Sequence, residues 1–181
     1  MNFTTSFTAA AVALTLATSA FAAGSDSSEP PKPTETTQKC KKHKIWDKAK
    51  NKCVKIQKSE LSDDGIYKNA RELAYAGRYK GALELLDKAA NQQDPRILNY
   101  KGFANRKLGY TKRAVEFYEQ ALAIDPKYIL ARSYYGQAKM QVGDVAGAQE
   151  QLALINDVSG TDNWAYESLS RAIQGDTLLN Y

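Results

Sequence analysis

The chain has 181 residues, of which 43% are hydrophobic, 25% charged and 10% aromatic. These fractions are typical of a globular protein and exclude collagen-like, fully disordered and multi-span membrane chains. The net charge is +5, but residues 39–58 alone carry nine Lys and one Asp, whereas residues 59–181 carry a net charge of −1. Because the basic residues are concentrated in one segment, the overall charge does not predict a nucleic-acid-binding protein.

Residues 1–22 have the pattern of a secretory signal peptide. An uncharged, apolar run from Ala9 to Leu16 is followed by small residues and by an A-x-A cleavage pattern that ends at Ala22. The segment departs from the usual pattern in having no Lys or Arg before the apolar run. A membrane anchor is the alternative, but the run is shorter than the ~20 apolar residues that cross a bilayer. We expect cleavage after Ala22 and a mature protein in the periplasm or, alternatively, secreted.

Residues 23–38 contain three Pro and no large apolar side chain, which predicts a disordered linker. The next segment, residues 39–58, contains both cysteines of the chain, Cys40 and Cys53. In an exported protein, two cysteines that flank a short loop are expected to form a disulfide, and the apolar residues on either side of the loop indicate a small β-hairpin. A redox pair is a poorer interpretation because it requires C-x-x-C, and a zinc site with His43 would be crowded by lysines.

The junction between this hairpin and the rest of the chain is made polar by Lys55, Gln57, Lys58, Ser59 and Glu60. It predicts a hairpin that is not packed on the rest of the chain. The alternative is a hairpin docked as an N-terminal cap.

From residue 61 onward the sequence repeats with a spacing of 32 and 34 residues. Gly77, Gly109 and Gly143 lie at equivalent positions, each with a small residue seven positions before it and an Ala five positions after it. Apolar residues recur at helical spacing on both sides of each Gly, so each unit is predicted to be a helix–turn–helix. Such a helix pair cannot bury its apolar stripe alone, and neighbouring pairs must therefore stack.

These units resemble the tetratricopeptide repeat (TPR), in which the same pattern of Gly, Ala, a large residue and Ala ends near Asp-Pro. The third unit departs from the pattern, since Arg132 stands where an apolar residue is usual. The resemblance implies an all-α fold, a TPR α-solenoid of three helix–turn–helix repeats with a C-terminal capping helix, preceded by the disulfide-closed hairpin. The expected bounds are 61–160 for the repeats (61–94, 95–128 and 129–160), 161–174 for the capping helix and 175–181 for a tail.

In the TPR family the first helix of each repeat lines a concave groove that binds peptides. The resemblance places nine candidate partner-binding residues on this groove: Tyr67, Arg71, Tyr75, Asn99, Phe103, Arg106, Lys107, Tyr134 and Gln137. It places further residues of the same helices there too: Asp64, Ala74, Arg96, Tyr100, Leu130, Ser133 and Gln141. The charged clamp by which some TPR domains hold a peptide carboxylate is not reproduced. Phe103 would be an aromatic anchor for the partner; the alternative is that Phe103 and the tyrosines pack between neighbouring repeats.

The sequence contains no phosphate-binding loop, dinucleotide-binding fingerprint, zinc-protease motif or G-x-S-x-G. We therefore expect a non-enzymatic scaffold or adaptor, without cofactor or bound metal, that binds a protein or peptide in the groove and does not bind nucleic acid. The alternative is that the hairpin binds an anionic envelope polymer or lipid headgroup while the repeats act as a spacer. The basic patch of that hypothesis consists of Lys41, Lys42, Lys44, Lys48, Lys50 and Lys52.

Overall fold

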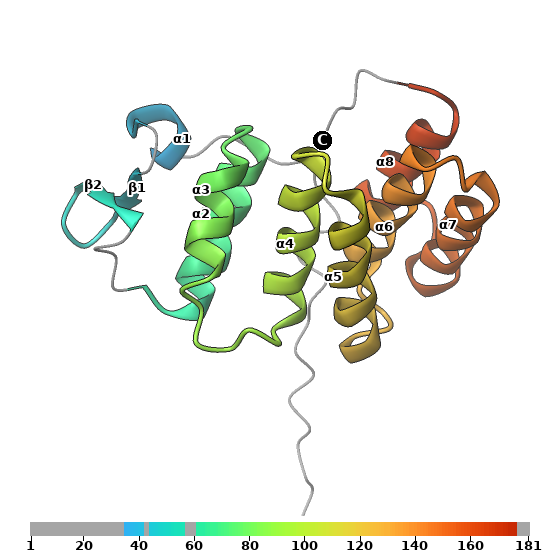
Figure 1. Ribbon diagram of the computed structural model, residues 1–181, viewed down its shortest axis with the longest axis horizontal. Coiled ribbons are helices and arrows are strands. Elements are labelled where there is room, and N and C mark those ends of the chain that lie inside the picture. Colours follow the sequence, from blue (N-terminus) through green and yellow to red (C-terminus); the bar gives the residue numbers. More distant parts are fainter. Residues whose placement is uncertain (1–34, 42–43, 57–60, 177–181) are drawn as a thin grey trace, which may run out of the picture.

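The computed structural model describes residues 35–41, 44–56 and 61–176. The predicted signal peptide, most of the predicted linker, Lys42, His43 and most of the predicted tail lie outside the described residues. Figure 1 shows a small hairpin at one end of the molecule, followed by helices that stack along the long axis. In the part of the chain that the structure describes, no helix is long and apolar enough to cross a membrane.

The described elements are one short helix, one two-stranded antiparallel sheet and seven further helices, which confirms the predicted all-α solenoid with a preceding hairpin. Their bounds are α1 (Glu35–Lys39), β1 (Lys44–Asp47), β2 (Lys52–Lys55), α2 (Asp63–Tyr75), α3 (Tyr79–Leu86), α4 (Pro95–Lys107), α5 (Thr111–Ile124), α6 (Ile129–Gln141), α7 (Val145–Ser159) and α8 (Trp164–Ile173).

The three equivalent glycines end the first helix of each repeat in the left-handed conformation. Their φ angles are 72° at Gly77, 85° at Gly109 and 79° at Gly143. A Cβ atom at any of them would meet nothing within 4 Å, so glycine is required there by backbone conformation and not by space. The second repeat begins with a clear start signal, because Asp94 caps α4 by accepting from the Arg96 N–H and Pro95 follows at the first helical position.

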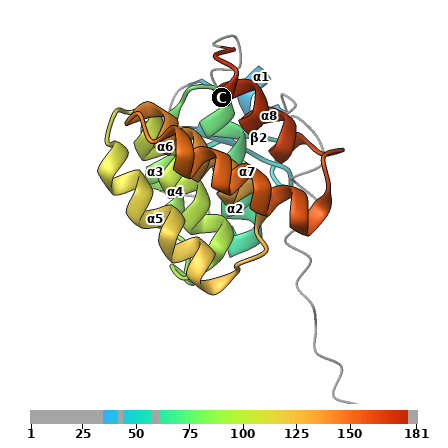
Figure 2. The ribbon, with the colours of Figure 1, turned by 90° about the vertical axis from the view of Figure 1, so that its right-hand side faces the viewer.

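The small residues seven positions before these glycines allow close packing, but against different partners. A Cβ atom on Gly102 would lie 2.6 Å from the ring of Tyr118, so α4 and α5 meet inside the second repeat. A Cβ atom on Gly136 would lie 2.6 Å from Leu169 of α8, so at this position α6 packs closely against α8 and not against α7. Figure 2 shows α7 and α8 in front of the stack when it is viewed from its C-terminal end.

Arg132 does not disturb the third repeat. Its guanidinium donates two hydrogen bonds to the Pro126 carbonyl, at 2.6 and 3.1 Å, and a third to Gln151 Oε1 at 3.0 Å. The side chain therefore ties α6 to the preceding turn and to α7, in the place where an apolar residue would have packed.

The hairpin is closed by a disulfide between Cys40 and Cys53, whose Cα atoms lie 5.6 Å apart, as predicted. Its strands pair in the register that places Ile45 opposite Val54. Ile45 and Ile56 are fully buried in the same core as Leu73 of α2. The expectation that the hairpin is separate from the repeats is therefore wrong, and the hairpin is an N-terminal cap.

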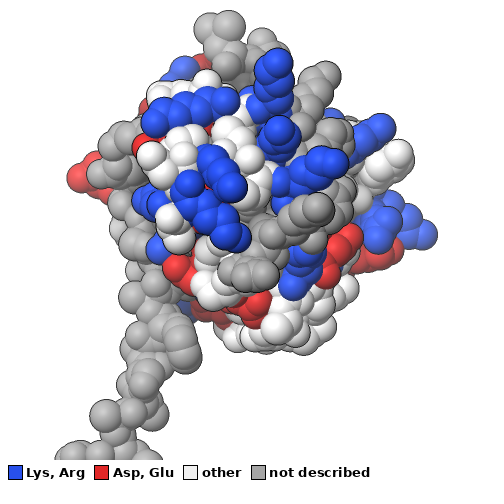
Figure 3. All heavy atoms as spheres, turned by 90° about the vertical axis from the view of Figure 1, so that its left-hand side faces the viewer, with Lys and Arg blue, Asp and Glu red and all other residues white. Residues whose placement is uncertain are grey.

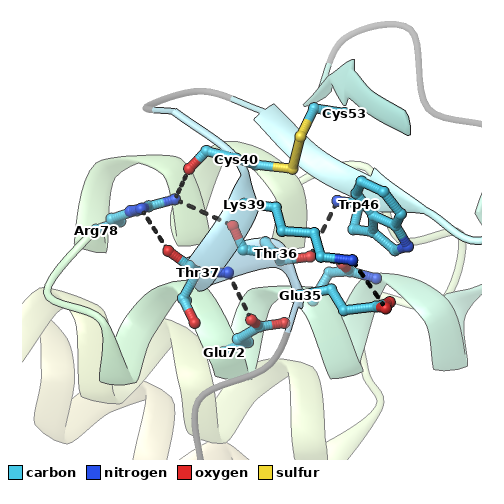
Figure 4. The surroundings of a disulfide bond; sticks show 10 residues. Glu35, Thr36, Thr37, Lys39, Cys40, Trp46, Cys53, Glu72 and Arg78 are labelled. Atoms are coloured by element: carbon cyan, nitrogen blue, oxygen red, sulfur yellow. Dashed lines mark hydrogen bonds and ion pairs between the residues drawn. A yellow bond between two sulfur atoms is a disulfide. The ribbon is translucent and has the colours of Figure 1, made fainter. Parts of the chain in front are cut away.

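Hydrogen bonds attach this cap to the first repeat (Figure 4). Arg78, in the α2–α3 turn, donates to the carbonyls of Thr36, Thr37 and Cys40 at 3.4, 3.2 and 2.8 Å. The Thr37 N–H in turn donates to Glu72 Oε1 at 2.7 Å. The polar junction led to the prediction of a separate hairpin. The bonds that attach the cap use backbone carbonyls of α1 and Cys40, and a pattern of side chains does not reveal such bonds.

Residues 35–38 were expected to belong to the disordered linker, and this part of the prediction is also wrong. They lie in α1, where the Thr36 side chain is buried. Its hydroxyl donates to Asn69 Oδ1 and accepts from the Trp46 N–H, both at 3.0 Å. One threonine thus joins α1 to the hairpin and to α2.

Reduction of the disulfide is expected to destabilise the helical stack and not the hairpin alone. A crosslink that closes a loop of this size contributes about 3 kcal/mol, which corresponds to a fall in Tm of roughly 6 to 12 °C. The measurement is a thermal melt followed by helical circular dichroism, with and without reductant. The variant with Cys40→Ser and Cys53→Ser cannot form the disulfide, so with or without reductant it should have the Tm of the reduced wild-type protein. Melts that overlap would show that the cap adds nothing to the stack.

Substitution of two helical glycines by alanine is expected to change stability in opposite directions. Gly102→Ala forces a Cβ atom against the buried Tyr118 ring, and overpacking of this kind costs about 1–3 kcal/mol. Gly81→Ala in α3 is the matched control, because its Cβ atom would meet Ile56 at 3.7 Å, an ordinary contact, and the helix would gain up to about 1 kcal/mol. Urea unfolding of both variants measures the difference. A Gly102→Ala protein as stable as the control would contradict the packing described.

Candidate functional site

The first helices of the three repeats, α2, α4 and α6, meet on one side of the stack. The Tyr75 hydroxyl of α2 lies 2.8 Å from the Tyr100 hydroxyl of α4 and 2.7 Å from the Tyr134 hydroxyl of α6. Helices of the first and third repeats can approach each other only on the concave side of a curved stack. This side is therefore the inner face of the solenoid.

We call Gly77, Gly109 and Gly143 the turn glycines. The positions ten, six and two residues before each of them lie about one helical turn apart, and they define three rows across the inner face. Each row takes one residue from α2, one from α4 and one from α6. The rows are Tyr67, Asn99 and Ser133; Arg71, Phe103 and Gln137; and Tyr75, Lys107 and Gln141.

The floor of the inner face is an aromatic cluster formed by Tyr67, Tyr75, Tyr79, Tyr100, Phe103 and Tyr134. Phe103 lies at its centre, with ring centroids of 4.9 Å to Tyr134, 5.6 Å to Tyr75 and 6.4 Å to Tyr79. Its side chain is only 1% exposed. The interpretation of Phe103 as an exposed anchor for a partner is therefore wrong, and the alternative of packing between repeats is correct.

Most of the other candidate groove residues are buried as well. The side chains of Arg71, Tyr75 and Lys107 are partly exposed, whereas the remaining six are buried: Tyr67, Asn99, Phe103, Arg106, Tyr134 and Gln137. The TPR resemblance predicts which side of a helix faces inward, but not how closely the curvature brings the three helices together.

The hydroxyl groups of Tyr100 and Tyr134 remain neutral. Burial raises the pKa of both Tyr100 and Tyr134 well above its usual value, and the neighbouring Tyr75 adds to the rise in each. Arg71 opposes the rise at Tyr100, because its Nε donates to the Tyr100 hydroxyl at 3.1 Å. Neutral hydroxyls can donate and accept at once, so the three helices stay joined over the physiological pH range.

The C-terminal half of the inner face is polar. Arg106 donates to Gln137 Oε1 at 2.9 Å, and the Gln137 amide donates to Ser168 of α8 at 2.9 Å. Beside Arg106, burial and the adjacent guanidinium lower the pKa of Lys107 to about 8. Helix α8 therefore closes this end of the inner face. Sequence analysis did not identify Ser168, because the repeat pattern carries no signal for how a helix after the last repeat folds back.

One row of the inner face contains polar atoms that lack hydrogen-bond partners within the described part of the chain. These are Tyr67 Oη, Asn99 Oδ1 and Ser133 Oγ, on side chains that are 3%, 0% and 0% exposed. The Asn99 amide nitrogen is engaged, since it donates to the Tyr128 hydroxyl at 3.3 Å. Leaving such an atom unsatisfied costs about 1–3 kcal/mol, and here the cost recurs at the same position in three successive repeats. We call this row the polar row.

The N-terminal end of the inner face opens into a cleft of about 1070 Å³ between the cap and α2. Tyr67, Arg71 and Tyr75 line both the inner face and this cleft, and the cap supplies Trp46 on the opposite side. The cleft was not anticipated from the sequence, because it depends on the docking of the cap.

The basic patch of the hairpin lies at the end of the molecule formed by the cap, and two of its lysines, Lys48 and Lys50, line the same cleft as Tyr67 of the polar row. Lys41, Lys44, Lys48, Lys50 and Lys52 are exposed there, and Lys42 lies outside the described residues. Among the described residues, no group of three or more His, Cys, Asp or Glu side chains could hold a metal ion.

Comparisons with known proteins agree with this architecture. The tetratricopeptide repeat family matches residues 107–173. No match was found among curated protein sequences. One similar solved structure is SycD, the type III secretion translocator chaperone of Yersinia enterocolitica, with a TM-score of 0.52 and 19% identity over 66% of this chain and 88% of that chain.

A second structure of SycD, in complex with a peptide of the translocator YopD, has a TM-score of 0.51 and 19% identity over 67% of this chain and 96% of that chain. A type III secretion complex from Aeromonas hydrophila has a TM-score of 0.52 and 15% identity, over 65% and 79% of the two chains. These identities establish similarity of fold. The family match to residues 107–173 and the three equivalent helix pairs agree in showing a repeat architecture of the tetratricopeptide type.

Proposed function

We propose that this protein is a non-enzymatic scaffold of the periplasm that binds an extended segment of a partner protein along its inner face. The observation that carries the proposal is the polar row, in which Tyr67, Asn99 and Ser133 hold unsatisfied atoms at one position of three successive repeats. These atoms are buried in the free protein, so a peptide reaches them only when the side chains that cover the row move aside. An extended peptide offers a donor and an acceptor at every residue, and its main chain is a suitable partner for such a row.

The spacing of the row suits an extended chain. Packed helices lie about 8–10 Å apart, and an extended peptide rises about 3.3 Å per residue. A peptide that crosses α2, α4 and α6 would therefore meet one row residue at about every third position. Asn99 Oδ1 would accept from a peptide N–H, while the hydroxyls of Tyr67 and Ser133 can donate to peptide carbonyls.

The cleft beside the cap gives such a peptide a way onto the inner face. Its lining combines the aromatic side chains of Trp46, Tyr67 and Tyr75 with cationic Arg71. At the opposite end, α8 lies against α6, so the peptide would enter from the cap side. The complex of the similar chaperone SycD with a peptide of YopD supports peptide binding by this fold.

The periplasmic location rests on the sequence pattern of residues 1–22. The disulfide is consistent with it, because such bonds persist in oxidising compartments. The absence of catalytic motifs in the sequence supports a scaffold over an enzyme.

Removal of single atoms from the polar row is expected to weaken peptide binding without loss of stability. Tyr67→Phe and Ser133→Ala each delete an unsatisfied hydroxyl, so the free protein should keep or slightly increase its Tm. Each lost hydrogen bond to the peptide should weaken binding by about 2–10-fold. The probes are peptides selected from a random display library on the full mature protein, with affinity measured by fluorescence anisotropy.

Tyr135→Phe is the matched control, because its hydroxyl bonds Glu119 at 2.9 Å on an exposed part of the stack. It should leave affinity unchanged. Failure of the library to yield any binder, or equal affinities for the polar-row variants and the wild type, would argue against the inner face as the binding site.

A further inference from the structure

The end of the solenoid formed by the cap has a high density of uncompensated positive charge. Figure 3 shows Lys and Arg side chains gathered over this end of the molecule, with acidic side chains mainly along one border. Among the residues that the structure describes, two cap lysines have carboxylate partners: Lys39 pairs with Glu35 at 3.5 Å and Lys50 with Asp47 at 3.4 Å. The cap lysines without a carboxylate within 4 Å among the described residues are Lys41, Lys44, Lys48, Lys52 and Lys55.

The strand register places two of these charges directly opposite each other. Lys44 pairs with Lys55 across the hairpin, next to the Ile45–Val54 pair. Side chains alternate between the faces of a sheet, and Ile45 is buried in the core. The lysine pair must therefore point outward. Like charges directly opposite in an antiparallel sheet are destabilising, so the hairpin carries a cost that a bound anion would relieve.

The cap keeps these lysines in fixed positions. The disulfide closes the hairpin, and the three bonds from Arg78 fix α1 to the first repeat. The large exposed hydrophobic side chains of the described residues all lie on other parts of the stack: Tyr110, Ile124, Val142, Val145 and Val158. The cap surface is thus suited to electrostatic contact without insertion of apolar groups.

We propose that this basic end face binds the surface of a bilayer that contains anionic phospholipids. Among the uncompensated lysines, Lys48 lines the cleft beside the cap, whereas Lys41, Lys44, Lys52 and Lys55 do not. Their spread over the end of an elongated molecule (Figure 3) matches a flat anionic surface better than a single polymer strand. Each lysine near such a surface strengthens binding roughly fivefold, and the attraction is lost beyond a Debye length. This inference is independent of peptide binding on the inner face, since the polar row takes no part in it.

The test is co-sedimentation of the mature protein with vesicles of phosphatidylcholine and phosphatidylglycerol, compared with vesicles of phosphatidylcholine alone. Binding is expected only to the anionic vesicles, and it should disappear in about 1 M salt, where the Debye length is about 3 Å. The variant with Lys44→Gln and Lys55→Gln should bind more than tenfold more weakly. Its Tm should be unchanged or higher, because the repulsion across the hairpin is removed.

The control variant carries Lys112→Gln and Lys127→Gln, which remove the same charge from exposed positions on α5 and the turn after it. It should bind like the wild type. An equal loss of vesicle binding in both variants would mean that only the net charge matters. Binding of the wild-type protein to soluble polyphosphate is measured as well, and binding to polyphosphate but not to vesicles would indicate a polymer as the ligand. Either result, or no binding to anionic vesicles, overturns the proposal.

Discussion

The hydroxyl of Tyr75 joins all three repeats, and the curvature of the solenoid depends on this contact. It lies within 2.8 Å of Tyr100 Oη and 2.7 Å of Tyr134 Oη, so residues separated by 59 positions in sequence meet across α4. In buried, low-dielectric surroundings such hydrogen bonds reinforce one another, and burial raises the pKa of Tyr100 and Tyr134, which keeps these two hydroxyls neutral. A stack that is closed in this way holds its inner face in one shape. The atoms of the polar row are buried in this shape, so a ligand reaches them only after the side chains that cover the row move apart, and this opening reduces the net affinity.

The two ends of the solenoid are completed by different physical means. At the C-terminal end, α8 buries Trp164 and Leu169, and Leu169 fits against Gly136, so this end is closed mainly by apolar packing. At the N-terminal end the cap buries two isoleucines but depends as well on a disulfide and on backbone hydrogen bonds to Arg78. Both ends keep charged groups on the outside, Glu167 and Arg171 on α8 and the lysines on the cap, but only the second arrangement is strongly basic. The same arrangement leaves a cleft where the cap meets α2.

The sequence predicts the repeats well because their signals are local and are repeated three times. The turn glycines need positive φ, and the small residues mark close contacts, whatever the overall shape of the molecule. The exposure of Phe103 could not be predicted in the same way, because it depends on the distance between α2 and α6. The docking of the cap was missed for a related reason, since Arg78 recognises carbonyl groups of α1 and an amino-acid pattern does not record them.

The cap connects the two surfaces for which we propose partners. Its outer side carries the uncompensated lysines, while Trp46 faces the cleft that leads to the inner face. Because the cap lies at one end of the long axis (Figure 1), contact of the lysines with a bilayer would hold the stack end-on, with α7 and α8 at the end away from the lipid. The open mouth of the inner face would then lie next to the membrane. A partner segment that emerges from the bilayer surface would reach the polar row over a short distance, whereas a segment arriving from the opposite end would meet α8.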